Sequence, residues 1–196
     1  MKILVQRIIG ALTFNSQVYK DVEHDTSFTP TAWMIVVVSA FLNQLGGNAY
    51  HGFGEIGKWA IGTVGYTITS VIAFALGALV MSWLAKAIFN AEVTFEEVVR
   101  TVGLAYIWTA FGVIGIVGGI FLPLACLLAP IGFLAAILGL AASFIALKEA
   151  VDLDVVQTLV VVVVGFVINL VFGAIMGIIL GIFGFGSAML SGAFNV

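Results

Sequence analysis

Two long stretches of the chain contain no Asp, Glu, Lys, Arg or His: Thr101 to Leu147 and Val155 to Val196. An α-helix rises about 1.5 Å per residue, so crossing the roughly 30 Å hydrocarbon core of a bilayer takes about 20 residues. The first stretch is long enough for two crossings, and the second for one crossing with a tail. The pattern therefore predicts an integral membrane protein.

Apolar runs separated by short polar segments predict an all-α bundle of five transmembrane helices between residues 29 and 183. Thr29 is placed to cap the first of these helices, with Pro30 at the first helical position, where its missing N–H does no harm. A short tail, 184–196, follows the last helix. The expected spans cover 31–47, 59–84, 98–121, 124–147 and 155–183.

Two of the expected helices carry a capping-box signature at their start. In this motif a side-chain oxygen and a Glu or Gln three residues later each accept a hydrogen bond from the other's backbone N–H. Thr94 with Glu97 fits the start of the third helix, and Asp154 with Gln157 fits the start of the fifth. Both helices should therefore begin in the polar region and then enter the membrane.

Residues 1–28 show a different pattern, with polar and apolar positions alternating at helical spacing. This is typical of an amphipathic helix that lies in the membrane surface, and a partly ordered leader is the alternative interpretation. The polar positions are Lys2, Gln6, Thr13, Gln17 and Lys20.

Composition agrees with the membrane assignment, since only 9% of residues are charged, against about 25% in soluble domains. Because there is no basic stripe, nucleic acid is not an expected partner. Loop charges predict the orientation: six of the seven basic residues fall on the side of the N-terminus and only Lys58 on the other. The positive-inside rule then places the N-terminus in the cytoplasm and the C-terminus outside.

Small residues repeat at four-residue spacing on the third and fifth helices, where they let helix backbones approach closely. We expect packing within the bundle, and the alternative is a homodimer seam or a surface that a lipid or solute contacts. An asparagine near the middle of the fifth helix is expected to bond between helices. The positions are Gly115, Gly119, Asn169, Gly173, Gly177 and Gly181.

Charged residues on the expected cytoplasmic face form a candidate docking surface for a soluble protein or a lipid headgroup. Glu96 and Arg100 are four residues apart and could pair along one helix face. Lys148 and Glu149 lie in the connection to the fifth helix. The candidate docking residues are Glu96, Glu97, Arg100, Lys148 and Glu149.

Signatures of enzyme chemistry are missing from the sequence: it has no phosphate-binding Gly-Lys-Ser/Thr loop, nucleophile elbow or His-Glu-x-x-His motif. We therefore expect a protein that is not an enzyme and needs no cofactor. Asp21, His24 and Asp25 share a spacing that could serve a divalent metal, but a solvated linker is the simpler interpretation.

The residues before the third span, Thr94 to Tyr106, carry a Phe-Glu-Glu start and a later Gly-Leu-Ala-Tyr segment. Together with the turn Ala146–Ala150, this stretch resembles the Yip1 domain family over about Ile8 to Leu180. Trp108 and Thr109 stand where the family commonly has a proline, and the long N-terminal region of eukaryotic members, with its Asp-Leu-Tyr-Gly-Pro motif, is missing. Those relatives bind Rab-type GTPases, a property that we do not carry over.

The resemblance implies a short, prokaryotic-type, multi-pass protein of the inner membrane. Our first functional hypothesis is a non-enzymatic scaffold or adaptor with membrane lipids, a cytoplasmic protein and possible further copies of itself as partners. The alternative is a conduit for a small solute or ion, lined by Pro130, Asn169 and the glycine-rich third and fifth helices. A metal site at Asp21, His24 and Asp25 is a third, separate hypothesis.

Overall fold

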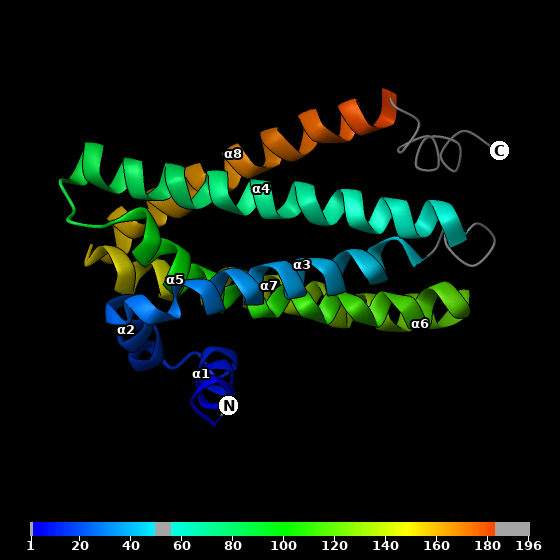
Figure 1. Cartoon of the computed structure of the whole chain (residues 1–196), viewed down its shortest axis with the longest axis horizontal. Coiled ribbons are helices and arrows are strands. Elements are labelled where there is room, and N and C mark those ends of the chain that lie inside the picture. The colour runs from blue at the N-terminus through cyan, green and yellow to red at the C-terminus, as the bar shows by residue number, and fades with distance from the viewer. Residues whose placement is uncertain (1, 50–55, 183–196) are drawn as a thin grey trace.

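The computed structural model describes residues 2–49 and 56–182, and this part of the chain is helical almost throughout (Figure 1). Four long helices, and one span made of three shorter helical segments, run side by side along the long axis. The elements in chain order are α1 (Lys2–Leu12), α2 (Ser16–His24), η1 (Thr26–Phe28), α3 (Thr29–Gly47), α4 (Ile56–Phe89), α5 (Phe95–Ala105), η3 (Tyr106–Ile114), α6 (Gly115–Ile120), α7 (Leu122–Val151) and α8 (Val155–Ile182).

Five helical stretches among the described residues are long and apolar enough to cross a membrane: α3, α4, the continuous α5–η3–α6 segment, α7 and α8. They alternate in direction, so the α4–α5 and α7–α8 connections lie at one end and the α6–α7 connection lies at the other (Figure 1). Large apolar side chains cover the outside of the bundle, as a hydrocarbon solvent requires. The chain is therefore an all-α, multi-pass membrane protein, as predicted.

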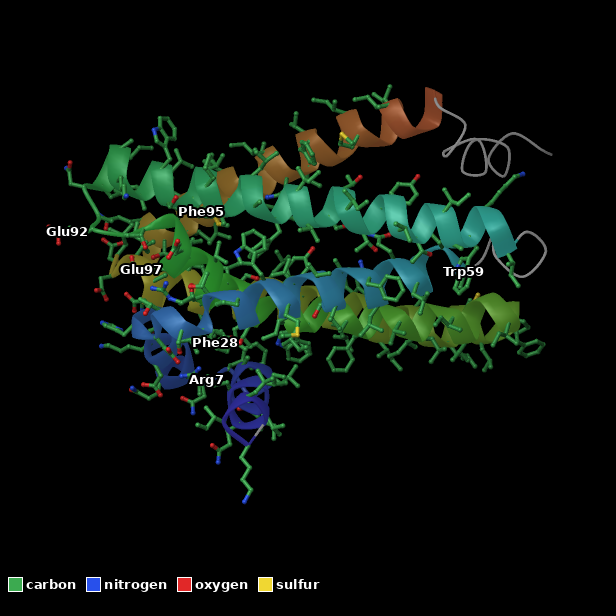
Figure 2. The ribbon with its side chains drawn as sticks, in the orientation of Figure 1. Arg7, Phe28, Trp59, Glu92, Phe95 and Glu97 are labelled. Atoms are coloured by element: carbon green, nitrogen blue, oxygen red, sulfur yellow. The ribbon has the colours of Figure 1, made fainter. Side chains whose placement is uncertain are left out.

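Charged side chains collect at one end of the bundle, where Glu92 and Glu97 lie, whereas Trp59 lies at the other (Figure 2). We call the first the charged end. It receives the N-terminus of α3, the C-terminus of α4, the N-terminus of α5, and the α7–α8 connection. The helix starts and ends there explain the clustering, because polar capping groups and charges must lie outside the hydrocarbon region.

The N-terminal segment is amphipathic, as predicted, but it forms two helices rather than one continuous helix. Phe14 adopts a left-handed backbone conformation (φ 58°), and Asn15 caps α2 by accepting a 3.1 Å hydrogen bond from the Gln17 N–H. The Phe14 ring stacks on Trp108 with centroids 5.6 Å apart, which compensates for an unfavourable backbone region. In Figure 1, α1 is viewed nearly end-on, so it crosses the direction of the long helices beside the charged end.

Both predicted capping boxes are confirmed. At α5 the Glu97 N–H donates to the Thr94 hydroxyl at 3.2 Å, and the Thr94 N–H donates to the Glu97 carboxylate at 2.6 Å. At α8 the Gln157 N–H donates to the Asp154 carboxylate at 2.8 Å, with the reciprocal bond at 3.4 Å. These local bonds determine where the third and fifth spans begin.

The expected cap at the start of the first span was wrong. Thr29 lies inside α3 with helical backbone angles (φ −51°, ψ −48°), and the preceding residue, Phe28, occupies the cap position without a capping side chain. The short helix η1 leads directly into α3, so the Thr29 hydroxyl is free for another role. It accepts a 3.3 Å hydrogen bond from the Arg100 guanidinium.

The middle of the third span winds as a 3-10 helix, η3, which the hydrophobic pattern did not indicate. Here the backbone approaches α3 so closely that a Cβ added to Gly112 would lie 1.9 Å from the Asn43 side-chain oxygen. A Cβ added to Gly46 would lie 2.0 Å from the Gly112 carbonyl oxygen. Only glycine fits at such a contact, where the two backbones pack directly on each other.

Candidate functional site

Arg100 is the most heavily bonded charged residue at the charged end. It lies in α5, only 3% of its surface is exposed, and its Nε donates to the backbone carbonyls of Val22 (3.1 Å) and Glu23 (2.9 Å). Another guanidinium nitrogen also donates to the Glu23 carbonyl. These carbonyls belong to the last turn of α2, where helix carbonyls lack an i+4 partner within the helix; the Val22 carbonyl also accepts a 3.3 Å hydrogen bond from the N–H of the cap residue, Asp25. Arg100 therefore attaches α2 to α5 and neutralises the C-terminal end of the α2 dipole.

The predicted pair between Glu96 and Arg100 is present but weak, with a nitrogen–oxygen separation of 3.9 Å. The Glu96 side chain is 65% exposed, and screening by water makes such a pair worth little. The expectation that Arg100 belongs to an exposed docking surface was wrong. Its strong bonds run to α2, which follows from burial: a buried guanidinium needs several close acceptors.

Carboxylates from three helices lie near one another at the charged end. Glu23 of α2 interacts electrostatically with Glu97 of α5, Glu149 of α7 and Asp152, which follows α7. The pKa of Glu23 is raised, chiefly because burial removes water from its carboxylate, and neighbouring Asp152, Glu97 and Glu149 add to the rise. We call Glu23, Glu96, Glu97, Glu149 and Asp152 the acidic rim.

A second ion pair holds α1 against the α2–α3 junction. The Arg7 guanidinium donates to the Asp25 carboxylate at 2.8 Å and lies 4.7 Å from the centre of the Phe28 ring, in a cation–π arrangement. Asp25 also accepts hydrogen bonds from the Ser27 N–H (3.1 Å) and hydroxyl (2.5 Å). These bonds from Ser27, followed by the contact with Arg7, lower the pKa of Asp25. Arg7 and Phe28 lie together below the charged end in Figure 2.

The structure does not bring the suggested metal ligands together. Asp25 faces Arg7, Asp21 accepts a 3.0 Å hydrogen bond from the Gln17 side chain, and the His24 ring lies 3.0 Å from the Lys20 carbonyl. Within the described ranges, no group of three or more His, Cys, Asp or Glu side chains is arranged to hold a metal ion. The spacing along the chain was misleading because α2 ends at His24 and the backbone turns there.

Glycines that share one sequence motif have different surroundings. Gly115 and Gly119 pack against the backbone of α3 and the residue Ala49, where an added Cβ would lie 2.7 Å from a carbonyl oxygen in each case. Gly173 and Gly177 have open space around them, so the expected packing within the bundle does not occur at these positions. They belong to the second half of α8, which leaves the bundle (Figure 1). Gly181 lies one turn further along the same helix.

A cavity of about 270 Å³ lies within the bundle, between α4, α5, η3, α7 and α8. Asn169 lies in its wall, over Gly77 of α4, where a Cβ would come within 2.5 Å of the side-chain nitrogen. The expected hydrogen bond between helices is not found among the described residues: the same nitrogen donates to the Gly165 carbonyl of its own helix at 3.0 Å, and Asn169 meets α4 only by packing. The polar residues of the lining are Ser70, Tyr106, Ser143 and Asn169.

Sequence reasoning identified Asn169 but missed the other polar residues of this cavity. Ser70, Tyr106 and Ser143 are isolated in apolar runs, and no spacing relates them to one another. Only the packing of four spans places them around one space. Of the residues expected to line a conduit, Asn169 borders the cavity, whereas Pro130, Gly173 and Gly177 do not.

The fold, the charged end and the cavity define the class: a helical, multi-pass membrane protein with a charged end and a mostly apolar interior cavity. The family model of the Yip1 domain matches residues 9–177, which is most of the chain. The chain therefore belongs to the Yip1 domain family, in agreement with the resemblance seen in its sequence. No curated protein and no solved structure matches it.

Proposed function

We propose that this protein is a non-enzymatic scaffold or adaptor of the inner membrane, whose charged end faces the cytoplasm and docks a soluble protein. The excess of Lys and Arg on that side of the predicted topology supports this orientation. The N-terminus is then cytoplasmic and the C-terminus extracytoplasmic.

The observation that carries the proposal is the acidic rim. Its carboxylates come from α2, from α5 and from the end of α7, and Glu96 and Asp152 are exposed to solvent. Arg100, which lies next to Glu96 and Glu97, is buried and occupied by the carbonyls of α2, so it does not cancel the charge that the rim presents outward. A cluster of carboxylates attracts groups of the opposite sign, so we expect a basic segment on the docking protein.

Site-specific photo-crosslinking in intact cells tests this proposal. A photoreactive amino acid at Glu96 or Asp152 should give an adduct with a soluble protein, and one at Ile61, an exposed position in the apolar part of α4, should not. The combined variant Glu23→Gln, Glu149→Gln removes two negative charges and leaves the side-chain shapes nearly unchanged, so it should reduce the yield of adducts several-fold. Adducts of equal yield in that variant, or none at either rim position, would count against docking by the rim.

The conduit remains the competing function, and liposome flux separates the two. No measurable flux of any small solute or ion in a broad panel would support the scaffold. Leakage that is abolished by Asn169→Leu would instead support a conduit through the cavity. The rim variants should leave such leakage unchanged, because their charges lie outside the cavity lining.

Association of two copies through α8 is part of this proposal. The face that carries Gly173 and Gly177 is open in the single chain, and small residues there would let a second helix approach closely. Replacing both glycines with leucine should shift the protein toward the monomer in mild detergent. The matched control is Gly115→Leu, which should damage the fold of the single chain. An unchanged oligomeric state in the first variant would contradict the dimer.

A further inference from the structure

The cavity lies at membrane depth, away from both ends of the bundle. Asn169 is fourteen residues into α8, which is about 21 Å along the helix from its start at the charged end. Tyr106 follows α5 directly and is eleven residues from the start of that helix, or roughly 16 Å. The cavity therefore lies between the charged end and the middle of the hydrocarbon region.

Polar groups in the cavity wall lack partners within the described part of the chain. Among the described residues, no hydrogen bond is found for the hydroxyls of Tyr106 and Ser143, and the Asn169 side chain donates one N–H, to the Gly165 carbonyl. Ser70 differs, because its hydroxyl accepts from the Gln44 side chain at 3.0 Å. Unpaired polar groups are costly in a membrane interior, since the surrounding lipid tails offer no hydrogen bonds.

The residues that the structure describes in the lining include no charged side chain, and this limits what can bind. An ionised headgroup at this depth would lose its water without gaining a counter-charge. A neutral group with carbonyl or hydroxyl oxygens would instead match the wall. It could accept bonds from the two hydroxyls and from the second N–H of Asn169, and donate to the Asn169 carbonyl oxygen.

The cavity has a route to the bilayer between α7 and α8. Leu140 of α7 and Phe166 of α8 both line it, and they are 48% and 46% exposed, so the cavity is not sealed at these two side chains. A tail could therefore run along these two side chains into the lipid. The volume, near the lower limit of ordinary ligand sites, suits a compact head rather than a whole lipid.

We propose that this cavity binds an uncharged lipid, whose compact carbonyl- or hydroxyl-bearing head contacts Tyr106, Ser143 and Asn169 and whose aliphatic tail leaves between α7 and α8. An isoprenoid quinone and a diacylglycerol share this chemistry. The edge-to-face pair of Phe74 and Tyr106, with ring centroids 5.2 Å apart, forms part of the wall and offers apolar contact to either head. The proposal is independent of docking at the acidic rim.

Photoactivatable lipids test the site on the full-length protein in phosphatidylcholine nanodiscs. Three probes carry the reactive group at the start of the tail: a diacylglycerol, an isoprenoid quinone and, as the charged counterpart, a phosphatidic acid. Adducts are mapped to peptides by mass spectrometry. We expect at least one neutral probe to label residues 140–143 or 162–169 saturably, and phosphatidic acid to give no saturable labelling there. The neutral probe that labels identifies the head chemistry.

Two kinds of variant examine the contacts. Tyr106→Phe removes one hydroxyl with little change of shape and should weaken neutral-probe binding about fivefold, as the loss of one neutral hydrogen bond does. Ala73→Phe fills the cavity from α4 and should abolish saturable labelling. Tyr66→Phe is the matched control for the loss of a tyrosine hydroxyl. Tyr66 lies on α4, as Ala73 does, but outside the lining, so this variant should bind the neutral probe as the wild type does.

Equal labelling of the wild type, Tyr106→Phe and Ala73→Phe would overturn the proposal, as would labelling by phosphatidic acid alone or by none of the probes. Because Ala73→Phe could disturb the fold, Tyr106→Phe provides the decisive comparison with Tyr66→Phe. Failure here would leave the rim crosslinks unaffected, so the two proposals are judged separately.

Discussion

Arg100 offers the most direct perturbation of this fold, because one side chain joins α2 to α5 across nearly eighty residues of sequence. Arg100→Met keeps much of the length and apolar stem of the side chain but removes every donor. The carbonyls of Val22 and Glu23 then lose their charged partner in a buried place. A hydrogen bond to a charged group is worth about 1.5–3 kcal/mol, so losing these bonds should cost about 3–5 kcal/mol in the attachment of α2.

Hydrogen–deuterium exchange of the α2 amides measures this attachment in detergent or nanodiscs. A loss of about 3 kcal/mol should speed exchange at residues 18–24 roughly a hundredfold, while α4 and α7 keep their protection. Arg100→Lys should be intermediate, since a compact ammonium cannot match the guanidinium's spread of donors. Glu96→Gln should change exchange less than about threefold, because it removes only an exposed, 3.9 Å pair.

The reciprocal exchange of Glu96 and Arg100 gives a further comparison. A carboxylate at position 100 would face the carbonyls of α2, so we expect the double variant to remain as destabilised as Arg100→Met. Rescue by the double variant would mean that the Glu96 pair, and not the bonds to α2, dominates. Protection of α2 at wild-type level in Arg100→Met would refute the reasoning outright.

Three further predictions concern other contacts. Gly46→Ala should lower thermal stability in detergent by about 1–3 kcal/mol, because its Cβ would clash with the Gly112 carbonyl oxygen. Gly173→Ala should be neutral or slightly stabilising, because the space around Gly173 is open; equal effects of the two variants would contradict the assigned packing. The lowered pKa of Asp25 means that its stabilisation of α1 is complete above the ordinary value of 3.8 and is lost as pH falls through the lower folded value. Fluorescence anisotropy of a label on α1 should therefore drop only at strongly acidic pH, and Asp25→Asn should show release already at neutral pH; a pH-independent wild type would contradict this. Glu97→Ala should cost about 1 kcal/mol of thermal stability, while Glu97→Gln should retain the capping box and lose little, and the reverse order would exclude the box as the cause.

The starts of α5 and α8 could be predicted because each depends on residues three positions apart. Thr94 with Glu97, and Asp154 with Gln157, satisfy backbone groups that every helix start leaves open. The five membrane-spanning helices could also be predicted from the sequence, since the hydrocarbon core favours any apolar helix of sufficient length, whatever its neighbours. The break at Phe14 was missed because its compensation, the ring of Trp108, lies far away in the chain.

At the candidate site, too, local spacing was predictive only where the contact is local along the chain. Sequence spacing paired Arg100 with Glu96, yet the partners that matter are carbonyls of α2 that only docking brings near. Gly115 and Gly173 share a motif, but one is covered by α3 and the other is open. Tyr106 and Ser143 have no sequence relation, although they face one cavity with Asn169.

The amino-acid order alone was sufficient for the number of spans, the starts of α5 and α8 and the family, because helix hydrogen bonds and partition into lipid act within a few turns of the chain. The assembled bundle was needed to show which arginine is buried, which glycines are covered and where a cavity opens. Those properties arise when segments distant in the chain pack together, and apolar helices are too alike for hydrophobicity to specify their neighbours.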